Sequence, residues 1–191
     1  MENQKKIALM TKVGSGGFID QLEIIRQLGV KPEMKIADLG CGAGYFTIPM
    51  AKMMRNTGKV YAVDVLSAAL EAVKSQAKLD GLVNVEVVRA NVEVVGSTKI
   101  PDGKIDLVVM ANILFQCSDY DAVFTEAKRM LAPGGRITVI DWIPNNVALG
   151  PKFENCVPEE SAKKMAIENG LKVIKEISAG DTHYGFILEL I

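Results

Sequence analysis

The sequence predicts an α/β fold: a three-layer sandwich around a Rossmann-like, mostly parallel seven-stranded sheet with one antiparallel strand near its C-terminal edge. Short apolar runs that suit buried strands alternate with segments whose apolar residues recur at helical spacing. Strands and helices that alternate at these lengths form parallel sheets with helices on both faces. The last two apolar runs are separated only by Ala179-Gly180-Asp181, which is short enough for a hairpin turn.

The elements follow one another along the chain without an internal repeat. Strands are expected at residues 34–40, 59–65, 84–90, 104–112, 136–142, 171–178 and 182–190. Helices are expected at residues 19–29, 45–54, 67–81, 119–135 and 158–170.

Cap and turn residues set several helix boundaries. Gly29 ends the first helix, and Pro49 fits the first turn of the second. Ser67 and Asp119 are expected as N-caps of the next two helices. Pro133, followed by a glycine, is expected to stop the helix that begins at Asp119.

Length and composition predict one domain over residues 1–191, with residues 1–19 as a polar lead-in. Gly16, Gly17 and Phe18 in this lead-in allow a lid over the site, or a hydrophobic staple for the helix that follows. The net charge is −1 and no basic run exceeds two residues, so we expect no nucleic-acid partner. No apolar stretch is long enough for a membrane span, and the three cysteines show no metal or disulfide spacing. We therefore expect a cytoplasmic protein without a metal site.

The stretch "IADLGCGAGYFTI", from Ile36 to Ile48, is the clearest candidate for a ligand site. It fits neither the dinucleotide pattern GxGxxG nor the phosphate loop GxxxxGK[ST]. Its pattern is D-x-G-x-G-x-G, and Asp38 at the start would repel a pyrophosphate. A ligand with a positive charge, such as S-adenosylmethionine (SAM), suits this carboxylate, and glycines let the backbone approach it closely.

This segment resembles motif I of the class I SAM-dependent methyltransferases. "YAVDV", "VVRANVE", "IDLVVMANILF" and "RMLAPGGRITVIDW" resemble the later motifs of the same family, in the same order. The similarity covers nearly the whole chain and is strongest to the ubiquinone/menaquinone C-methyltransferase-like group. It implies transfer of a methyl group from SAM to a small molecule, with S-adenosylhomocysteine (SAH) as the second product.

The resemblance also implies which residues hold SAM. They are Asp38, Gly40, Cys41, Gly42, Gly44, Asp64, Val65, Asn91, Val92 and Asn112. Asp64 ends its strand where adenosine-binding sheets place a ribose-binding acid, although a strand-end aspartate can also cap the next helix. Asn91 stands where the family usually has an aspartate for adenine, although asparagine is also a common turn former. Cys41 has packing as its simplest role.

Three residues are candidates for the acceptor side: Asn112, His183 and Tyr184. The segment from Asn112 to Phe115 lacks the prolines of the amino-group methyltransferase motif, which argues against N-methylation of adenine or glutamine. The final hairpin places His183 and Tyr184 at the carboxyl-end face, where an imidazole can act as a base. Because adjacent strand residues face opposite sides, we expect at most one of the two to point into the pocket.

Other functions are compatible with parts of the sequence. A non-catalytic SAM-binding module would keep the glycine loop, and an arsenite methyltransferase would use Cys117 and Cys156 as thiolate ligands. A nicotinamide oxidoreductase is disfavoured by the failed GxGxxG pattern. Asp141 with Asn145 and Asn146 has the chemistry of a hard-cation site, but a plain loop is the simpler interpretation. The short connection at 144–157 suggests an open site, a bulky acceptor, or closure by a second copy in a homodimer.

Overall fold

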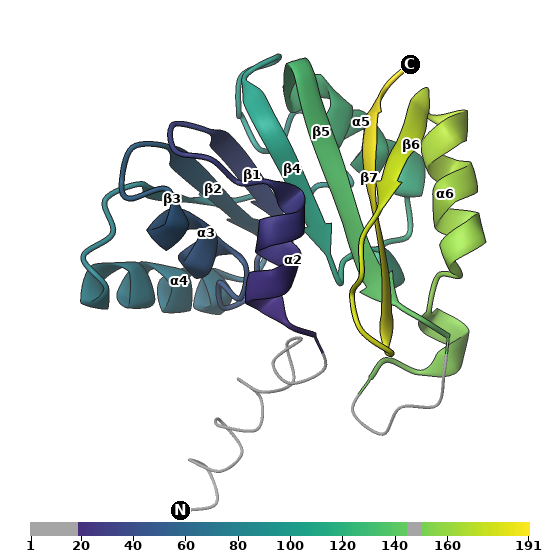
Figure 1. Ribbon diagram of the computed structural model, residues 1–191, viewed down its shortest axis with the longest axis horizontal. Helices are drawn as coiled ribbons and strands as arrows, with labels where there is room; N and C mark the ends of the chain where they lie inside the picture. Colours follow the sequence, from purple (N-terminus) through teal and green to yellow (C-terminus); the bar gives the residue numbers. More distant parts are fainter. Residues whose placement is uncertain (1–18, 145–149) are drawn as a thin grey trace, which may run out of the picture.

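The computed structural model describes residues 19–144 and 150–191, and these form a seven-stranded sheet in the order β3-β2-β1-β4-β5-β7-β6 (Figure 1). The strands are β1 (Lys35–Leu39), β2 (Lys59–Asp64), β3 (Val85–Arg89), β4 (Ile105–Ala111), β5 (Leu131–Trp142), β6 (Leu171–Glu176) and β7 (His183–Leu190). Strand β7 lies between β5 and β6 and runs antiparallel to both, whereas the other paired strands of the sheet are parallel. The predicted fold class is confirmed.

Five α-helices cover the described sheet, and two short 3₁₀ turns lie in its connections. The α-helices are α2 (Gln21–Leu28), α3 (Thr47–Met53), α4 (Ser67–Leu79), α5 (Tyr120–Met130) and α6 (Glu159–Glu168). The 3₁₀ turns are η1 (Leu114–Gln116) and η2 (Phe153–Asn155). No helix within the described residues is long and apolar enough to cross a membrane.

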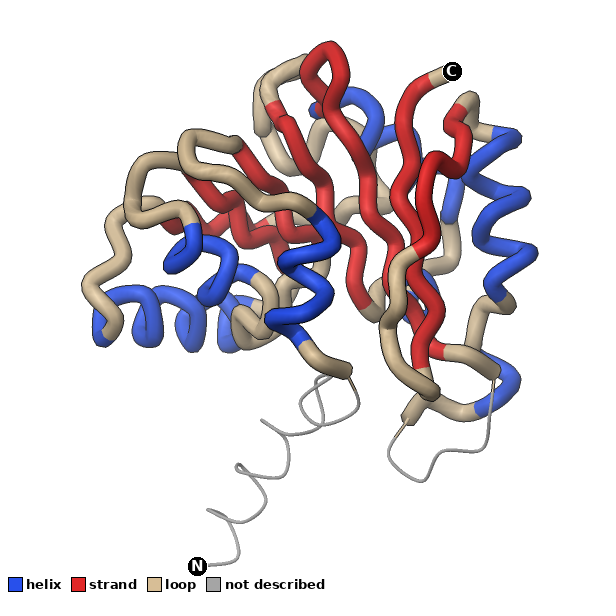
Figure 2. Tube along the Cα trace, viewed as in Figure 1, coloured by secondary structure: helices blue, strands red, loops and turns tan. Residues whose placement is uncertain are grey.

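The buried residues form three clusters, and two of them take alternate side chains of the central strand β4. Helices lie on both faces of the sheet (Figure 2). Leu107 and Val109 of β4 pack in a cluster with residues of α2 and α3. Val108 and Met110 pack in a second cluster with residues of α5 and α6. Because adjacent strand residues point to opposite faces, the two clusters lie on opposite sides of the sheet, with helices outside both.

The carboxyl ends of β1, β2, β3, β4 and β5 lie along one edge of the sheet, which we call the carboxyl edge. The antiparallel pairing of Trp142 with His183 brings the start of β7 to this same edge. Residues from separate parts of the chain are therefore collected at one place.

Two predicted boundaries are wrong. The helix expected over 119–135 ends at Met130, and the residues after it begin β5. Leu131 pairs with Ile105, and the amide of Lys104 donates to the carbonyl of Met130 at 2.8 Å. These contacts with the start of β4 extend the strand back through the proline and glycines. Ser67 is not the N-cap of α4, because Leu66 occupies that position with no side-chain cap bond.

The other helix signals are consistent with the structure. Asp20 caps α2 by accepting from the amide of Glu23, and Gly29 ends the helix in the left-handed conformation. Asp119 caps α5, and Pro49 lies in the first turn of α3. The lead-in expected at 1–19 lies outside the described residues except for Ile19, and so do positions 145–149 of the long connection.

Candidate functional site

Three glycines shape the loop after β1, and they do so for two different reasons. Gly40, Gly42 and Gly44 all have positive φ, at 72°, 52° and 89°. A Cβ on Gly40 would lie 2.9 Å from Ile113 Cδ1, and one on Gly44 would lie 3.1 Å from Val73 Cγ2. A Cβ on Gly42 would meet nothing within 4 Å. The outer two glycines therefore permit close packing, whereas Gly42 leaves space above its own backbone.

A cavity of about 590 Å³ opens beside this loop. This volume is within the range of small-molecule sites in proteins. The side chains that line the cavity beyond the loop include Gln21, Tyr45, Asn112, Phe115, Gln116 and Trp142. The loop forms one end of the site, and residues that follow β4 and β5 form the other.

Two carboxylates flank the loop. Asp38 is buried, and it accepts a hydrogen bond from Thr47 Oγ1 at 2.5 Å. Burial raises the pKa of Asp38 to about 6, although hydrogen bonds from Thr47 oppose the shift. Asp64 at the end of β2 accepts from the amide of Gly42 at 3.0 Å and from the amide of Leu66 at 2.9 Å.

The carboxylate of Asp64 therefore does part of the work that the sequence assigned to Ser67. It holds the entry to α4 and the middle of the glycine loop together. A carboxylate offers about four lone-pair directions, so two amide donors leave room for further donors.

The other predicted SAM contacts lie around this loop in different settings. Cys41 lines the cavity but is packed against the core, and burial raises the pKa of its thiol. Val65 is half exposed, while Val92 is buried in the main core. Asn91 is exposed, and its side-chain oxygen accepts from the amide of Glu93 at 3.0 Å. The described lining of the cavity includes none of four predicted contacts: Asp64, Val65, Asn91 and Val92.

Asn112 follows the last residue of β4, lines the cavity and has a strained backbone. Its φ is 56°, in the left-handed region that asparagine tolerates better than most residues. Its amide donates to the carbonyl of Ile140 at 2.8 Å, and its carbonyl accepts from Gln116 Nε2 at 2.8 Å. Strain of this kind is concentrated at functional sites.

His183 and Tyr184 reach the carboxyl edge as predicted, but both are buried. The His183 ring lies 4.0 Å from the Trp142 ring, centroid to centroid, and its Nδ1 lies 2.9 Å from Thr182 Oγ1. Burial lowers the pKa of His183 to about 4, so its imidazole is neutral at physiological pH. Tyr184 stacks on Phe186 within the core, and burial raises the pKa of its hydroxyl. Within the described part of the chain, neither side chain lines the cavity, and Trp142 lies between His183 and that space.

Sequence reasoning missed two buried carboxylates that hold the loops around the site. The strand expected over 136–142 includes Asp141, although the same residue was also considered for a cation site or a plain loop, and the structure shows its side chain fully buried in β5. Glu126 lies on the buried face of α5. The available signal was a charged residue inside an apolar strand or on an apolar helix face, because such residues are buried only when their hydrogen bonds are satisfied.

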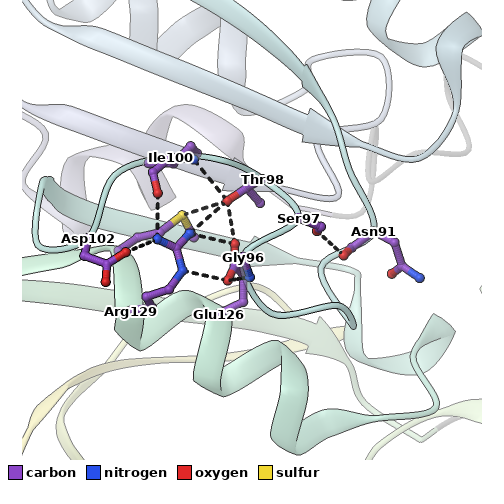
Figure 3. Close-up of polar contacts among 9 residues, drawn as sticks. Asn91, Gly96, Ser97, Thr98, Ile100, Asp102, Glu126 and Arg129 are labelled. Atoms are coloured by element: carbon purple, nitrogen blue, oxygen red, sulfur yellow. Dashed lines mark hydrogen bonds and ion pairs between the residues drawn. The ribbon is translucent and has the colours of Figure 1, made fainter.

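Glu126 fixes the connection between β3 and β4 (Figure 3). It accepts from the amide of Gly96 at 2.6 Å, from Thr98 Oγ1 at 2.5 Å and from Arg129 Nη2 at 2.9 Å. Arg129 also donates to the Ile100 carbonyl and forms an ion pair with Asp102. This network anchors the segment that begins at the predicted adenine contact.

The thiols do not form a ligand cluster within the described chain. No group of three or more His, Cys, Asp or Glu side chains within residues 19–144 and 150–191 could hold a metal ion. Cys117 and Cys156 are both free and partly buried. Burial raises the pKa of Cys117 to about 12 and also raises that of Cys156. The described residues therefore show no cluster that would support the arsenite alternative.

Comparison with known proteins relates this geometry to a family. Residues 30–182 match the family model described as "Methyltransferase domain". The ubiquinone/menaquinone biosynthesis C-methyltransferase UbiE of Shewanella halifaxensis is 31% identical over 119 residues, which make up 62% of this chain and 46% of that protein. The chain thus spans about half the length of the curated relatives it matches.

Solved structures extend the similarity to nearly the whole chain. A SAM dependent methyltransferase from Aquifex aeolicus is 26% identical, with a TM-score of 0.83 and 91% of each chain covered. A putative type 11 methyltransferase from Sulfolobus solfataricus is 24% identical, with a TM-score of 0.74, 91% of this chain and 94% of that chain covered, and shares the fold.

Proposed function

Because this chain belongs to the class I SAM-dependent methyltransferase family, we propose that it binds SAM at the carboxyl edge and methylates a small-molecule acceptor, releasing SAH. The observation that carries the proposal is the loop after β1. Its middle glycine, Gly42, lines the cavity together with Asp38 and has open space at its Cβ position, and its amide donates to Asp64.

The residues present fit SAM. Asp38 is a buried carboxylate beside the cavity, and the groups that shift its pKa include no cation. The ammonium group of a methionine moiety would supply one. Asp64 retains acceptor capacity for ribose hydroxyls, and Asn91 with Val65 and Val92 would border the adenine.

When bound, SAM supplies an electrophilic methyl group, so the protein needs no covalent nucleophile of its own. The contribution of this chain is to align the acceptor and to exclude water. Asn112 and Gln116 offer polar groups at the acceptor end of the cavity, while Phe115 and Trp142 offer apolar walls. This mixture suits an uncharged acceptor with a ring and a polar substituent.

His183 and Tyr184 remain part of the proposal as residues behind the acceptor wall. Among the described residues, His183 Nε2 and the Tyr184 hydroxyl have no hydrogen-bond partner. To take a proton from the acceptor, His183 requires that the Trp142 side chain moves aside and that contact with the acceptor offsets the burial that lowers the imidazole pKa. Replacement of His183 by alanine then lowers turnover by roughly a hundredfold and leaves SAM affinity within about twofold.

The relatives named as C-methyltransferases of ubiquinone and menaquinone biosynthesis support a carbon as the methylated atom. We further propose that residues 1–191 act as one cytoplasmic domain without a nucleic-acid partner, with residues 1–19 as an N-terminal lead-in that serves as a lid or as a staple for the first helix. The net charge of −1 supports this exclusion. Closure of the site by a second copy is proposed as well, and light scattering of the purified chain would detect a homodimer.

The experiment uses a matched pair of glycine substitutions. Gly42 and Gly81 have similar φ values, 52° and 65°, and a Cβ on either would meet nothing within 4 Å. Gly42→Val and Gly81→Val therefore bear similar backbone strain, but only Gly42 lies in the loop. In isothermal titration with SAM and SAH, Gly42→Val should lose at least tenfold in affinity, whereas Gly81→Val should bind like the wild type. Equal affinities in both variants would make the loop purely structural.

Turnover is tested separately with radiolabelled SAM and a panel of quinols, phenols, amines, thiols and arsenite. Methylation of one of these classes identifies the acceptor. Binding of SAH without any methylation across the panel would instead favour a non-catalytic SAM-binding module.

A further inference from the structure

The turn between β4 and α5, residues 112–119, is held by two carboxylates that belong to neither element. Asp141 comes from β5, and Glu93 comes from the connection after β3. This turn carries Asn112, Phe115 and Gln116, the residues that line the acceptor end of the cavity.

Asp141 binds the first half of the turn. One oxygen of its carboxylate accepts from the amide of Leu114 at 2.8 Å, and the other accepts from the amide of Trp142 at 2.8 Å. The backbone amides of Ile113 and Phe115 also lower the pKa of this carboxyl. Neighbouring amides that favour one anion form a compact nest, and here the anion is a side chain of the protein itself.

Glu93 binds the second half of the turn. Its Oε1 accepts from the amides of Ser118 at 2.5 Å and Asp119 at 2.7 Å, at the start of α5. The backbone amide of Glu93 donates to the side chain of Asn91. Through Glu93, the acceptor turn is therefore linked directly to the segment proposed to border adenine.

We propose that Asp141 and Glu93 are positioning residues that hold the turn 112–119 as the preformed wall of the acceptor site. The inference rests on the proposed methyltransferase function. Neither residue lines the described cavity, so their effect on the acceptor passes through the turn.

Two features of the turn require such support. Asn112 has φ of 56°, which persists only where the surroundings impose it. The amide of Leu114 is in a fully buried residue, and without Asp141 it would lose the partner that satisfies it. An asparagine in place of Asp141 retains one oxygen but turns an NH₂ group toward an amide donor, so part of the nest must open.

The test measures hydrogen–deuterium exchange and ligand binding on the full chain. The variants are Asp141→Asn and Glu93→Ala, with Glu93→Gln as a rescue because it keeps the one oxygen that accepts both amides. Glu160→Gln is the control, since the Glu160 side chain is 89% exposed and far along the chain from the turn. We expect amides 112–119 to exchange at least tenfold faster in the first two variants, and at the wild-type rate in Glu93→Gln and Glu160→Gln.

Ligand binding separates positioning from general damage. SAH affinity should stay within threefold of the wild type, whereas KM for the acceptor found by the methylation panel should rise about tenfold with kcat changed less than threefold. Unchanged exchange in both variants would overturn the inference, and so would faster exchange with an unchanged acceptor KM.

Two further outcomes are also decisive. If Asp141→Asn does not fold, the comparison of Glu93→Ala with Glu93→Gln decides. If the wild type binds SAH but methylates nothing, the proposed function fails on catalysis, and the exchange of the turn alone decides whether the two carboxylates position it.

Discussion

Two connections of the sheet are each held by a buried carboxylate, and the pKa values of the two carboxyl groups are shifted in opposite directions. The connection after β3 is held by Glu126, and the turn after β4 is held by Asp141. Both side chains are fully buried, and both accept hydrogen bonds from loop backbone. Yet the pKa of Glu126 is lowered to about 2, while that of Asp141 is raised to about 6.

The difference comes from a counter-charge. Burial acts to raise both pKa values, but hydrogen bonds from Arg129, together with those from Gly96 and Thr98, outweigh it at Glu126. At Asp141 only backbone amides oppose burial, and they do not outweigh it. The connection after β3 is thus held by an ion pair between Glu126 and Arg129. The turn after β4 is held by the carboxylate of Asp141, whose pKa is raised toward neutral.

The largest expected effect on stability is at the ion-paired connection. Glu126→Gln removes the charge that Arg129 faces while keeping the side-chain shape, and it leaves the guanidinium with the exposed Asp102 as its remaining carboxylate partner. We expect a loss of roughly 2 kcal/mol in the free energy of unfolding, measured by urea denaturation, because hydrogen bonds to a charged group are lost.

Glu71→Gln is the matched control, because its ion pair with Lys74 has side-chain exposures of 66% and 54%. Its expected cost is less than about 0.5 kcal/mol. Similar costs for the two substitutions would show that the counter-charge at Glu126 contributes nothing, and the contrast with Asp141 would lose its cause.

Asp64 extends the comparison to a carboxylate that is only partly buried. Asp64→Ala removes the acceptor for the amides of Gly42 and Leu66 and the proposed acceptor for the ribose. We expect SAH affinity to fall about thirtyfold, or about 2 kcal/mol, by isothermal titration.

Asp64→Asn separates the two roles. If the carboxylate mainly holds the loop, asparagine, which keeps one acceptor oxygen, should recover part of the affinity. Wild-type affinity in Asp64→Ala would remove Asp64 from the site.

The sheet and the glycine loop were predictable because their determinants are local. Apolar runs specify strands, and glycines at Gly40, Gly42 and Gly44 specify a backbone with positive φ. The antiparallel position of β7 followed from the short turn before it. The start of β5 was not predictable, because the pairing of Leu131 with Ile105 is a tertiary contact that overrides the local proline and glycine signal.

The acceptor end of the cavity could not be predicted in detail, because its geometry is set by tertiary contacts. The sequence placed His183 at the correct edge, but it could not show that Trp142 would lie against the ring. Nothing near Asp141 in the chain indicates that its carboxylate accepts from amides 27 residues away. The bond from the Leu66 amide to Asp64 at the entry to α4 is local, and the sequence allowed it as a strand-end aspartate that caps the next helix. The bond from the Gly42 amide to the same carboxylate crosses to another loop, and no local signal indicates it.

Asp38 gives the smallest expected effect and the sharpest test of the counter-charge argument. Like Asp141 it is buried without an arginine, and its pKa is raised to about 6. The ammonium group of SAH would stabilise the ionised form, so the pKa in the complex must be lower than in the free protein. Binding then releases a proton below pH 6, and affinity falls by up to about tenfold for each pH unit below that value. Above pH 6 Asp38 is ionised in both the free protein and the complex, so the affinity should be constant.

Titrations with SAH at pH 5, 6 and 7.5 measure how the affinity changes with pH. Asp38→Asn should flatten it, whereas Asp141→Asn should leave it intact, although Asp141 titrates in the same range. A wild-type affinity that is the same at pH 5 and pH 7.5 would mean that the ligand supplies no counter-charge to Asp38.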